Sequence, residues 1–415
     1  MTRERITDVS LEQARAHEGS NSGGSTDLPG PNVPAIAALP ALAVAAMLLL
    51  ATYWDGAFDI RNWAPAGILA LLVLASWMAL GHTAPRTRLA TASLVALWGY
   101  AAWTLLSTIW APSPDLAWRG ADRTILYATL YTIPVLTLFA RKHMRLVGML
   151  LVAGIAVIAL ITMVRLIRHG PDLFLAGRLD SPIRYRNATA GLFSFPVWPL
   201  IAFAAVRGAS VVLRATCFAG AILCLGLAFL TQSRGVLLGL VIGGVVVLAF
   251  GPERLRRAWL SILAVGIIGA ASGPLLAPYD AFVAADAVHI SSRIDEAIGV
   301  LALVALGSFV IALVLAVLDN GLRGQDVRTA HSYAAGGLAV LTAFVLLAGL
   351  VKIGNPVSYA QSKWDEFTNV NAVIAGETRL GSVGGQRYDL WRVAVDEFKS
   401  RPLLGVGENN YQWDY

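Results

Sequence analysis

Charged residues are scarce in this chain of 415 residues. Asp, Glu, Lys and Arg make up only 14% of the sequence, whereas hydrophobic residues make up 57% and the mean hydropathy is +0.65. A soluble domain carries about a quarter charged residues. The deficit extends along the whole chain as uncharged runs of about 20 residues, long enough to cross roughly 30 Å of hydrocarbon as helices. The composition excludes a soluble globular protein and predicts an all-α, polytopic transmembrane helical bundle.

Cysteine and the common chemical motifs are also scarce. The two cysteines, Cys217 and Cys224, fall within one apolar run on one helical face, which is typical of small buried residues rather than of a disulfide or a metal pair. The sequence lacks metal-ligand spacings, Walker loops, nucleophile elbows and dinucleotide fingerprints. We therefore expect neither a metal nor a cofactor.

The expected spans also lack charge in their interiors, where no Asp, Glu, Lys or Arg lies. Ion-coupled transporters normally need a carboxylate or a histidine within the membrane. Because sodium can also be held by backbone carbonyls at broken helices, this absence weakens a transport function without excluding it.

The sequence divides into three parts. Residues 1–33 are polar and rich in Gly and Ser, so we expect a disordered cytosolic tail rather than a cleavable signal. Residues 34–353 form the expected transmembrane helical domain, and residues 354–415 form an extracytoplasmic loop segment. About eleven spans of bilayer length are expected, at 34–54, 63–80, 90–110, 124–140, 146–164, 188–206, 215–231, 235–250, 258–277, 297–318 and 334–351.

The loops between these spans alternate in charge. With a cytosolic N-terminus every inside loop is basic, whereas most outside loops are acidic or mixed, which supports both the orientation and the span count. The inside cations are Arg86, Arg88, Arg141, Lys142, Arg145, Arg207, Arg214, Arg254, Arg256, Arg257, Arg323 and Arg328. We therefore expect a multi-pass protein of the cytoplasmic (inner) membrane, and no nucleic-acid partner despite the net charge of +6.

One outside loop breaks this alternation. The segment GRLDSPIRYRNATAG, residues 177–191, carries Arg178, Arg184 and Arg186 on the side where cations are few. A single arginine there can snorkel to lipid phosphates, which is the alternative interpretation for each. Three together favour an anionic ligand such as a phosphate or a pyrophosphate.

Other residues of the outer side extend this hypothesis. Arg234 sits in a very short turn, where an anionic ligand and snorkelling are equally favoured, and Arg293 lies at the outer end of another span. Tyr185 and Asn187 are candidates to orient a sugar or pyrophosphate oxygen. Helix capping is the alternative, and it is favoured for Asn187.

Beyond the last expected span, the segment QRYDLWRVAVDEFKSR predicts an amphipathic helix. Tyr388, Trp391, Val395 and Phe398 share one face, which is expected to pack on the bundle or to lie at the membrane interface. Pro402 ends this helix, and PLLGVG then predicts a tight glycine-rich turn.

Three of these segments resemble recurring elements of the O-antigen ligase and polymerase family. GRLDSPIRYRNATAG is similar to an outer-loop motif in which Arg is followed by Asn and small residues, and TQSRG before an apolar span is similar to a second arginine element. RYDLWRVAVDEFKSRPLLGVGENNY resembles the large outer loop, with Arg-x-x-x-Trp and Pro-Leu-Leu-Gly-x-Gly. The matches occur in the family's order, on one side of the membrane, from just after the fifth span to the end of the chain.

The resemblance implies a metal-independent glycosyltransferase that moves a glycan from a polyprenyl-pyrophosphate carrier to a hydroxyl of a lipid or another glycan. Arg178 and Arg234 match the arginines that hold the pyrophosphate, and Arg387 matches the large-loop arginine. Supporting cations are expected at Arg184, Arg186 and Arg293. Guanidinium groups can stabilise the growing negative charge of a pyrophosphate leaving group without a metal. The expected partners are this lipid-linked glycan, the lipid or glycan acceptor, and membrane lipids.

The sequence departs from the family at the presumed base. That base is a histidine in a His-Asn element beyond PLLGVG, and no histidine follows His331 here. We interpret the chain as truncated within the large loop and assign no catalytic base.

Two other functions stay open: a permease for a small anion or lipid-linked precursor, and a non-catalytic membrane protein of envelope assembly. A permease predicts paired interrupted spans, for which Pro196, Pro199 and Gly243/Gly244 are candidates.

A topology map tests the orientation. Tyr185 should lie on the outer face, so a Tyr185→Cys variant should react with a membrane-impermeant maleimide in intact cells, while the native cysteines stay buried and unreactive. Labelling only after the cells are opened would place this loop in the cytosol and remove the physical basis of the pyrophosphate site.

Overall fold

The computed structural model describes residues 35–80, 87–138, 140–251, 253–286, 288–321, 336–337, 355–368 and 387–411. Within these ranges the chain is helical apart from loops and one hairpin, in which β1 (Phe174–Leu175) pairs antiparallel with β2 (Arg178–Leu179). The predicted all-α class is confirmed. The expected tail and nearly all of the expected eleventh span lie outside the described residues.

The helices follow the expected spans in order. The N-terminal helices are η1 (Ala35–Ala38), α2 (Leu39–Ala51), η2 (Asp55–Ala57), α3 (Ile60–Ala79), α4 (Arg88–Leu106), η3 (Ser107–Ile109) and α5 (Pro114–Thr137). The central helices are α6 (Arg141–His169), η4 (Gly170–Leu173), α7 (Arg186–Ser194), α8 (Val197–Ala204), α9 (Val211–Leu230) and α10 (Arg234–Phe250). The C-terminal helices are α11 (Arg254–Ala270), α12 (Ser272–Val283), α13 (Ile290–Gly321), α15 (Pro356–Thr368) and α16 (Arg387–Ser400).

Local side chains explain where several of these helices begin. Asp59, Thr87 and Ser210 precede α3, α4 and α9, and each side-chain oxygen accepts a hydrogen bond from a backbone N–H of the first turn. Such caps satisfy donors that have no partner within the helix. The polar residue before the apolar run therefore sets the start of each of these helices.

Six helical segments of the described chain are long and apolar enough to cross a membrane. They are α3, α4 with η3, α6 with η4, α7 with α8, α9, and α13, and the pair α11 and α12, bent by 44°, is a seventh if it counts as one broken span. The helices α2 and α10 are apolar but shorter. The expected number of eleven is therefore not confirmed.

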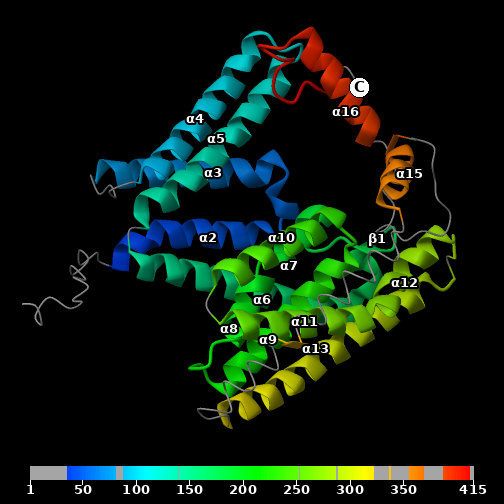
Figure 1. The fold of residues 1–415 in the computed structure, drawn as a ribbon. Helices are drawn as coiled ribbons and strands as arrows, with labels where there is room; N and C mark the ends of the chain where they lie inside the picture. The colour runs from blue at the N-terminus through cyan, green and yellow to red at the C-terminus, as the bar shows by residue number, and fades with distance from the viewer. Residues whose placement is uncertain are drawn as a thin grey trace, which may run out of the picture.

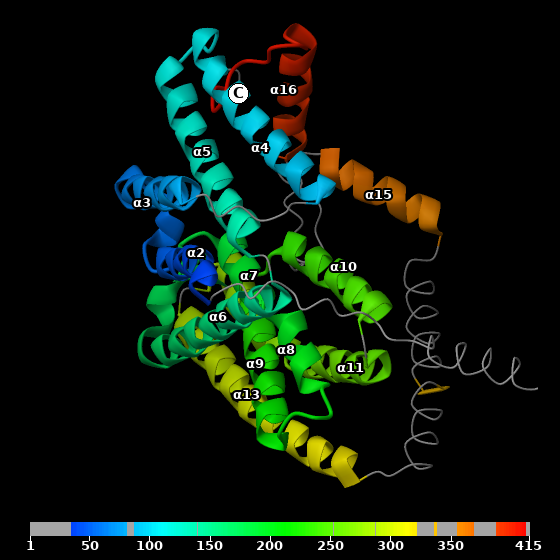
Figure 2. The same cartoon turned by 90° about the vertical axis from the view of Figure 1, so that its left-hand side faces the viewer.

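The helix α5 differs most from its expected span. It begins at Pro114 rather than near residue 124, so Asp115, Arg119, Asp122 and Arg123 belong to the helix rather than to a loop. It packs along α4 as a hairpin whose tip extends away from the central helices α6 to α13 (Figures 1 and 2). A proline at the first helical position, preceded by Ser113, explains this earlier start.

The main core surrounds α9. Phe218, Ile222 and Leu227 are fully buried on this helix, which packs against α7, α8 and α13, and Cys217 and Cys224 are buried and free as expected. A smaller core lies between α2, α3 and α5.

Proline and glycine have different effects on the candidate interrupted spans. The sixth span is broken between α7 and α8 at Pro196, as proline predicts. The interruption expected at Gly243 and Gly244 does not occur, because α10 is continuous there. A Cβ at these glycines would lie 2.9 and 2.7 Å from the Trp198 indole, whose Nε1 donates to the Leu240 carbonyl at 3.0 Å. The two glycines therefore make room for a tryptophan of α8.

The predicted amphipathic helix is confirmed as α16. Phe367 of α15 contacts Tyr388 and Trp391 at ring-centroid distances of 5.8 and 5.5 Å, so one end of the apolar stripe packs on α15. Val395 and Phe398 stay exposed.

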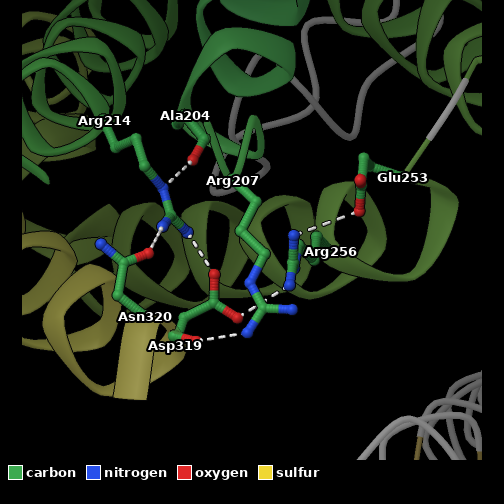
Figure 3. A network of polar contacts seen from close by, with 7 residues as sticks. All are labelled: Ala204, Arg207, Arg214, Glu253, Arg256, Asp319 and Asn320. Carbon is green, nitrogen blue, oxygen red and sulfur yellow. Dashed lines mark hydrogen bonds and ion pairs between the residues drawn. The ribbon is translucent and has the colours of Figure 1, made fainter. Parts of the chain in front are cut away.

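A network of arginines joins helix ends on the side where the sequence places the inside loops (Figure 3). The carboxylate of Asp319, near the end of α13, accepts hydrogen bonds at 2.9 Å from Nη2 of both Arg214 on α9 and Arg256 on α11. Arg207, between α8 and α9, donates to the Asp319 carbonyl at 2.9 Å. Arg214 also donates from Nε to the Ala204 carbonyl at 3.0 Å and from Nη1 to Asn320 Oδ1 at 3.3 Å. Cations that the sequence analysis assigned to the inside loops thus hold helices together.

Replacing Asp319 by Ala should lower the free energy of unfolding by about 3 kcal/mol, because it removes the carboxylate that two largely buried guanidinium groups share. Thermal unfolding in detergent measures this change. Glu253→Gln is the matched control, since this side chain is 43% exposed and its ion pair with Arg256 contributes about 0.5 kcal/mol or less. Equal effects of the two variants would show that the network does not stabilise the fold.

Candidate functional site

Arg178 is the most buried of the predicted site arginines whose side chains the structure describes. It is 9% exposed on β2, and its guanidinium carbon lies 5.6 Å from the centroid of the Tyr279 ring. Its Nε is buried and has no hydrogen-bond partner among the described residues. A buried donor without a partner costs about 1–3 kcal/mol. Arg178 therefore holds an unused donor that an anionic ligand can satisfy.

The turn between the two strands places Arg178 over Tyr279. Ala176 and Gly177 both have positive φ, at 52° and 69°. A Cβ on Gly177 would lie 2.5 Å from the Pro278 carbonyl oxygen and 2.8 Å from the Tyr279 Cα. Glycine is thus required both for the backbone conformation and for close contact with α12.

The structure brings Arg186 and Arg234 to two neighbouring helix N-termini. Arg186 is the first residue of α7 and Arg234 the first residue of α10, and both side chains are half-buried. Asn187 Oδ1 accepts a hydrogen bond from Ser233 Oγ at 3.0 Å, which joins the two N-termini. Helix N-termini present free N–H groups and partial positive charge, so this junction favours an anion.

Asn187 does not have the capping role favoured from the sequence. The N-cap position of α7 belongs to Tyr185, which forms no side-chain cap, and Asn187 Nδ2 donates to the Tyr185 hydroxyl at 3.2 Å. Capping is wrong here because Asn187 lies inside the first turn, from which its amide reaches the Ser233 hydroxyl. The residue joins two helices instead.

Arg184 and Tyr185 face a cavity of about 620 Å³ between α2, α3, α5 and the start of α7. Arg184 Nε lies 3.3 Å from Asp55 Oδ1, and the guanidinium side chain is 78% exposed. The second cation of the cavity is Arg123, whose guanidinium carbon lies 5.4 Å from the centroid of the Phe58 ring. Most of the wall is apolar, including Met47, Leu48, Ala51, Trp63, Leu126, Leu130 and Ile183. The cavity thus combines an apolar wall with cations at one end.

The remaining predicted cations are placed differently. Arg293, in the first turn of α13, is exposed and pairs with Glu296 on its own helix, with Nη1 and Oε2 3.0 Å apart. Arg387 is the first residue of α16, and its side chain lies outside the described part of the chain. The Arg293 contact is therefore an ion pair local to α13.

Two residues of this region were missed by the sequence interpretation. Burial raises the pKa of the Asp180 carboxyl, an effect that the Arg184 guanidinium partly offsets. The Asp180 carbonyl also accepts from Thr189 Oγ1 at 2.9 Å, which fixes the loop to α7. Asp180 lies between Arg178 and Arg184 in the sequence motif, and this position could have indicated that it belongs to the site. Arg123 carried no such signal, because only the fold brings α5 next to the 183–188 segment.

The fold and these cations define a multi-pass membrane protein with an arginine-rich site. Residues 219–415 match the family model for O-antigen ligase. The match, which spans slightly less than half of the chain, supports an O-antigen ligase-like family, as the motifs predicted, and with it a glycosyltransferase-type membrane enzyme of polysaccharide biosynthesis. No curated protein and no solved structure matches the chain. The family match includes Arg234, Arg293 and Arg387, whereas the 178–187 loop lies before it.

Gly177→Ala should lower the free energy of unfolding by about 2 kcal/mol or more, because Ala disfavours positive φ and its Cβ collides with α12. Gly191→Ala is the matched control. Apart from its chain neighbours and the adjacent backbone of α7, no atom of the described residues lies within 4 Å of a Cβ at this position, so the variant should be stabilised by up to about 1 kcal/mol. Thermal unfolding should show a less stable Gly177→Ala variant and a slightly more stable Gly191→Ala variant. An unchanged stability of the Gly177→Ala variant would contradict the close contact with α12.

Proposed function

We propose that the protein is a glycosyltransferase of the O-antigen ligase type at the outer face of the cytoplasmic membrane. It transfers a glycan from a polyprenyl-pyrophosphate carrier to a hydroxyl of a lipid or another glycan. The observation that carries this proposal is the buried Arg178, whose Nε lacks a partner among the described residues. A diphosphate supplies oxygens for such a donor, and the family match supports the same class of reaction.

The arginines act on the leaving group. In this reaction the acceptor oxygen forms a bond to the anomeric carbon, the bond from that carbon to the pyrophosphate oxygen breaks, and the hydroxyl proton is released. Negative charge grows on the pyrophosphate as its bond breaks. Arg178 and Arg234 hold the diphosphate, with Arg186 at the joined N-termini beside it, and a low-dielectric site strengthens this stabilisation. The catalytic base stays unassigned.

The cavity next to this region suits the carrier lipid. Its apolar wall offers a surface for isoprenoid units. Tyr185, which lines the cavity, and Asn187, which donates to the Tyr185 hydroxyl, orient polar oxygens of the donor. Arg184 can exchange its partner, because an exposed ion pair such as that with Asp55 contributes about 1 kcal/mol or less. Arg293 can also exchange its partner, because its ion pair with Glu296 is exposed in the same way. Arg293 and Arg387 are the other proposed supporting cations, besides Arg184 and Arg186.

Replacing Arg178 or Arg234 by Ala should lower transfer from a synthetic polyprenyl-pyrophosphate glycan by about a hundredfold or more, because a positioned donor to the developing charge is lost. Arg178→Lys should recover only part of the activity, since an ammonium keeps the charge without the planar fork of donors.

Arg61→Ala is the control, because this arginine is an exposed cation at the same outer side, at the start of α3. The assay uses purified full-length protein in lipid vesicles. Unchanged turnover of the Arg178 and Arg234 variants would show that the site has been assigned wrongly.

A permease is the second candidate, favoured by two interrupted helical segments. The break between α7 and α8 and the 44° bend between α11 and α12 are the kind of interruption that transporters use. Exchange of a lipid-linked precursor or small anion by vesicles, without a glycan product, would support this function. Activity that appears only with a partner protein would instead indicate a non-catalytic role in envelope assembly.

A further inference from the structure

The segment 402–411 docks on the tip of the α4–α5 hairpin, about 300 residues earlier in the chain (Figures 1 and 2). Asn410 is fully buried there. Its Oδ1 accepts from the Ser113 N–H at 2.7 Å, and its Nδ2 donates to the Ser113 carbonyl at 3.2 Å and to the Glu408 carbonyl at 2.8 Å. The amide therefore pairs with both backbone groups of one residue, as a neighbouring peptide would.

Further hydrogen bonds extend this contact along the segment. The Glu408 N–H donates to Ser107 Oγ at 3.0 Å, and Trp110 Nε1 donates to the Leu404 carbonyl at 3.1 Å. Backbone groups of the segment thus meet side chains of η3 and of the turn that follows it. A contact that uses backbone groups depends on the shape of the segment as well as on its side chains.

Glycines on both sides permit this close approach. Gly407 has φ 93°, and a Cβ there would lie 2.5 Å from Ala111 Cβ. On α5, a Cβ at Gly120 would lie 2.3 Å from Glu408 Cγ and 2.7 Å from Asn409 Nδ2. Gly407 of PLLGVG and Gly120 of α5 therefore fit the same interface from opposite sides.

The docked segment also holds α16. The Tyr411 hydroxyl donates a hydrogen bond to the Leu390 carbonyl in the first turn of this helix. Ser113, Asn410, Tyr411 and Leu390 form a continuous connection from the hairpin tip to the helix that begins with Arg387. The hairpin lies outside residues 219–415, whereas the docked segment lies inside them. A part of the chain that precedes the family match therefore holds a segment that belongs to the match.

We propose that the α4–α5 hairpin is the docking site that positions the large outer loop, and that Asn410 is the positioning residue. This inference rests on the proposed function only for its effect on glycan transfer. Asn410 does not touch the proposed diphosphate site, and it acts through the placement of α16. The Asn410→Asp variant tests this role, because Asp keeps the shape of Asn but presents a carboxylate, which cannot donate, to the two carbonyl oxygens that Asn410 Nδ2 now contacts.

A pair of introduced cysteines measures docking independently of enzymatic activity. Ser107→Cys and Glu408→Cys lie next to each other across the interface, where Ser107 Oγ accepts from the Glu408 N–H at 3.0 Å, so full-length protein in membranes should form a disulfide under mild oxidation, scored by loss of maleimide labelling. In an Asn410→Asp background the disulfide yield should fall several-fold. Asn409→Asp is the matched control, because Asn409 is exposed and makes one long contact, 3.4 Å to the Leu116 carbonyl. An undiminished yield in the Asn410→Asp protein overturns the proposal.

Transfer assays then test the consequence. Asn410→Asp should lower kcat at least tenfold, Asn409→Asp should not, and oxidation of the cysteine pair should restore transfer in the Asn410→Asp protein. Rescue by a cross-link separates positioning from a general loss of folding. Unchanged kcat in Asn410→Asp, or a formed cross-link without rescue, overturns the positioning role. Absence of transfer by the unmodified protein contradicts the proposed function instead, and the cross-linking result still decides whether Asn410 docks the loop.

Discussion

The structure depends on one constraint: a buried guanidinium group needs hydrogen-bond acceptors. Removing a guanidinium from water is costly unless its donors meet oxygen atoms. Each nitrogen of the Arg214 guanidinium donates to an oxygen within the protein, namely the Ala204 carbonyl, Asn320 Oδ1 or Asp319 Oδ2. Arg178, similarly enclosed, keeps a buried Nε for which the described residues supply no acceptor. The contrast separates an arginine that holds helices together from one that is suited to a ligand.

Close packing through glycine is the second recurring feature. Where charges are few, helices associate largely through close contact of small residues with larger ones. Gly226 faces Leu301, Gly243 and Gly244 face Trp198, and Gly177 faces α12. These contacts fix the positions of α9, α10 and the β-hairpin, and through them the position of Arg178 and the start of α10.

The N-terminal half of the chain supplies surfaces that lie outside the family match. The family match begins within α9, yet the cavity is formed mainly by α2, α3 and α5, and the docking site of the 402–411 segment lies between η3 and α5. The N-terminal half is thus more than an anchor. It supplies walls and contacts without which neither the cavity nor the docked segment would have its shape.

The order of the amino acids was enough to predict the helical membrane class, the break at Pro196, the buried cysteines and the helix that became α16. These features depend on composition, on local hydrogen bonding and on periodicity, all of which act within one or two helical turns. The roles of Asn187, Gly243 and Asp319, the early start of α5 and the docking of Asn410 emerge only from the packed, three-dimensional arrangement. Each depends on contact between segments far apart in the chain, and a one-dimensional pattern of charge and hydrophobicity does not encode which distant backbone group a side chain will meet.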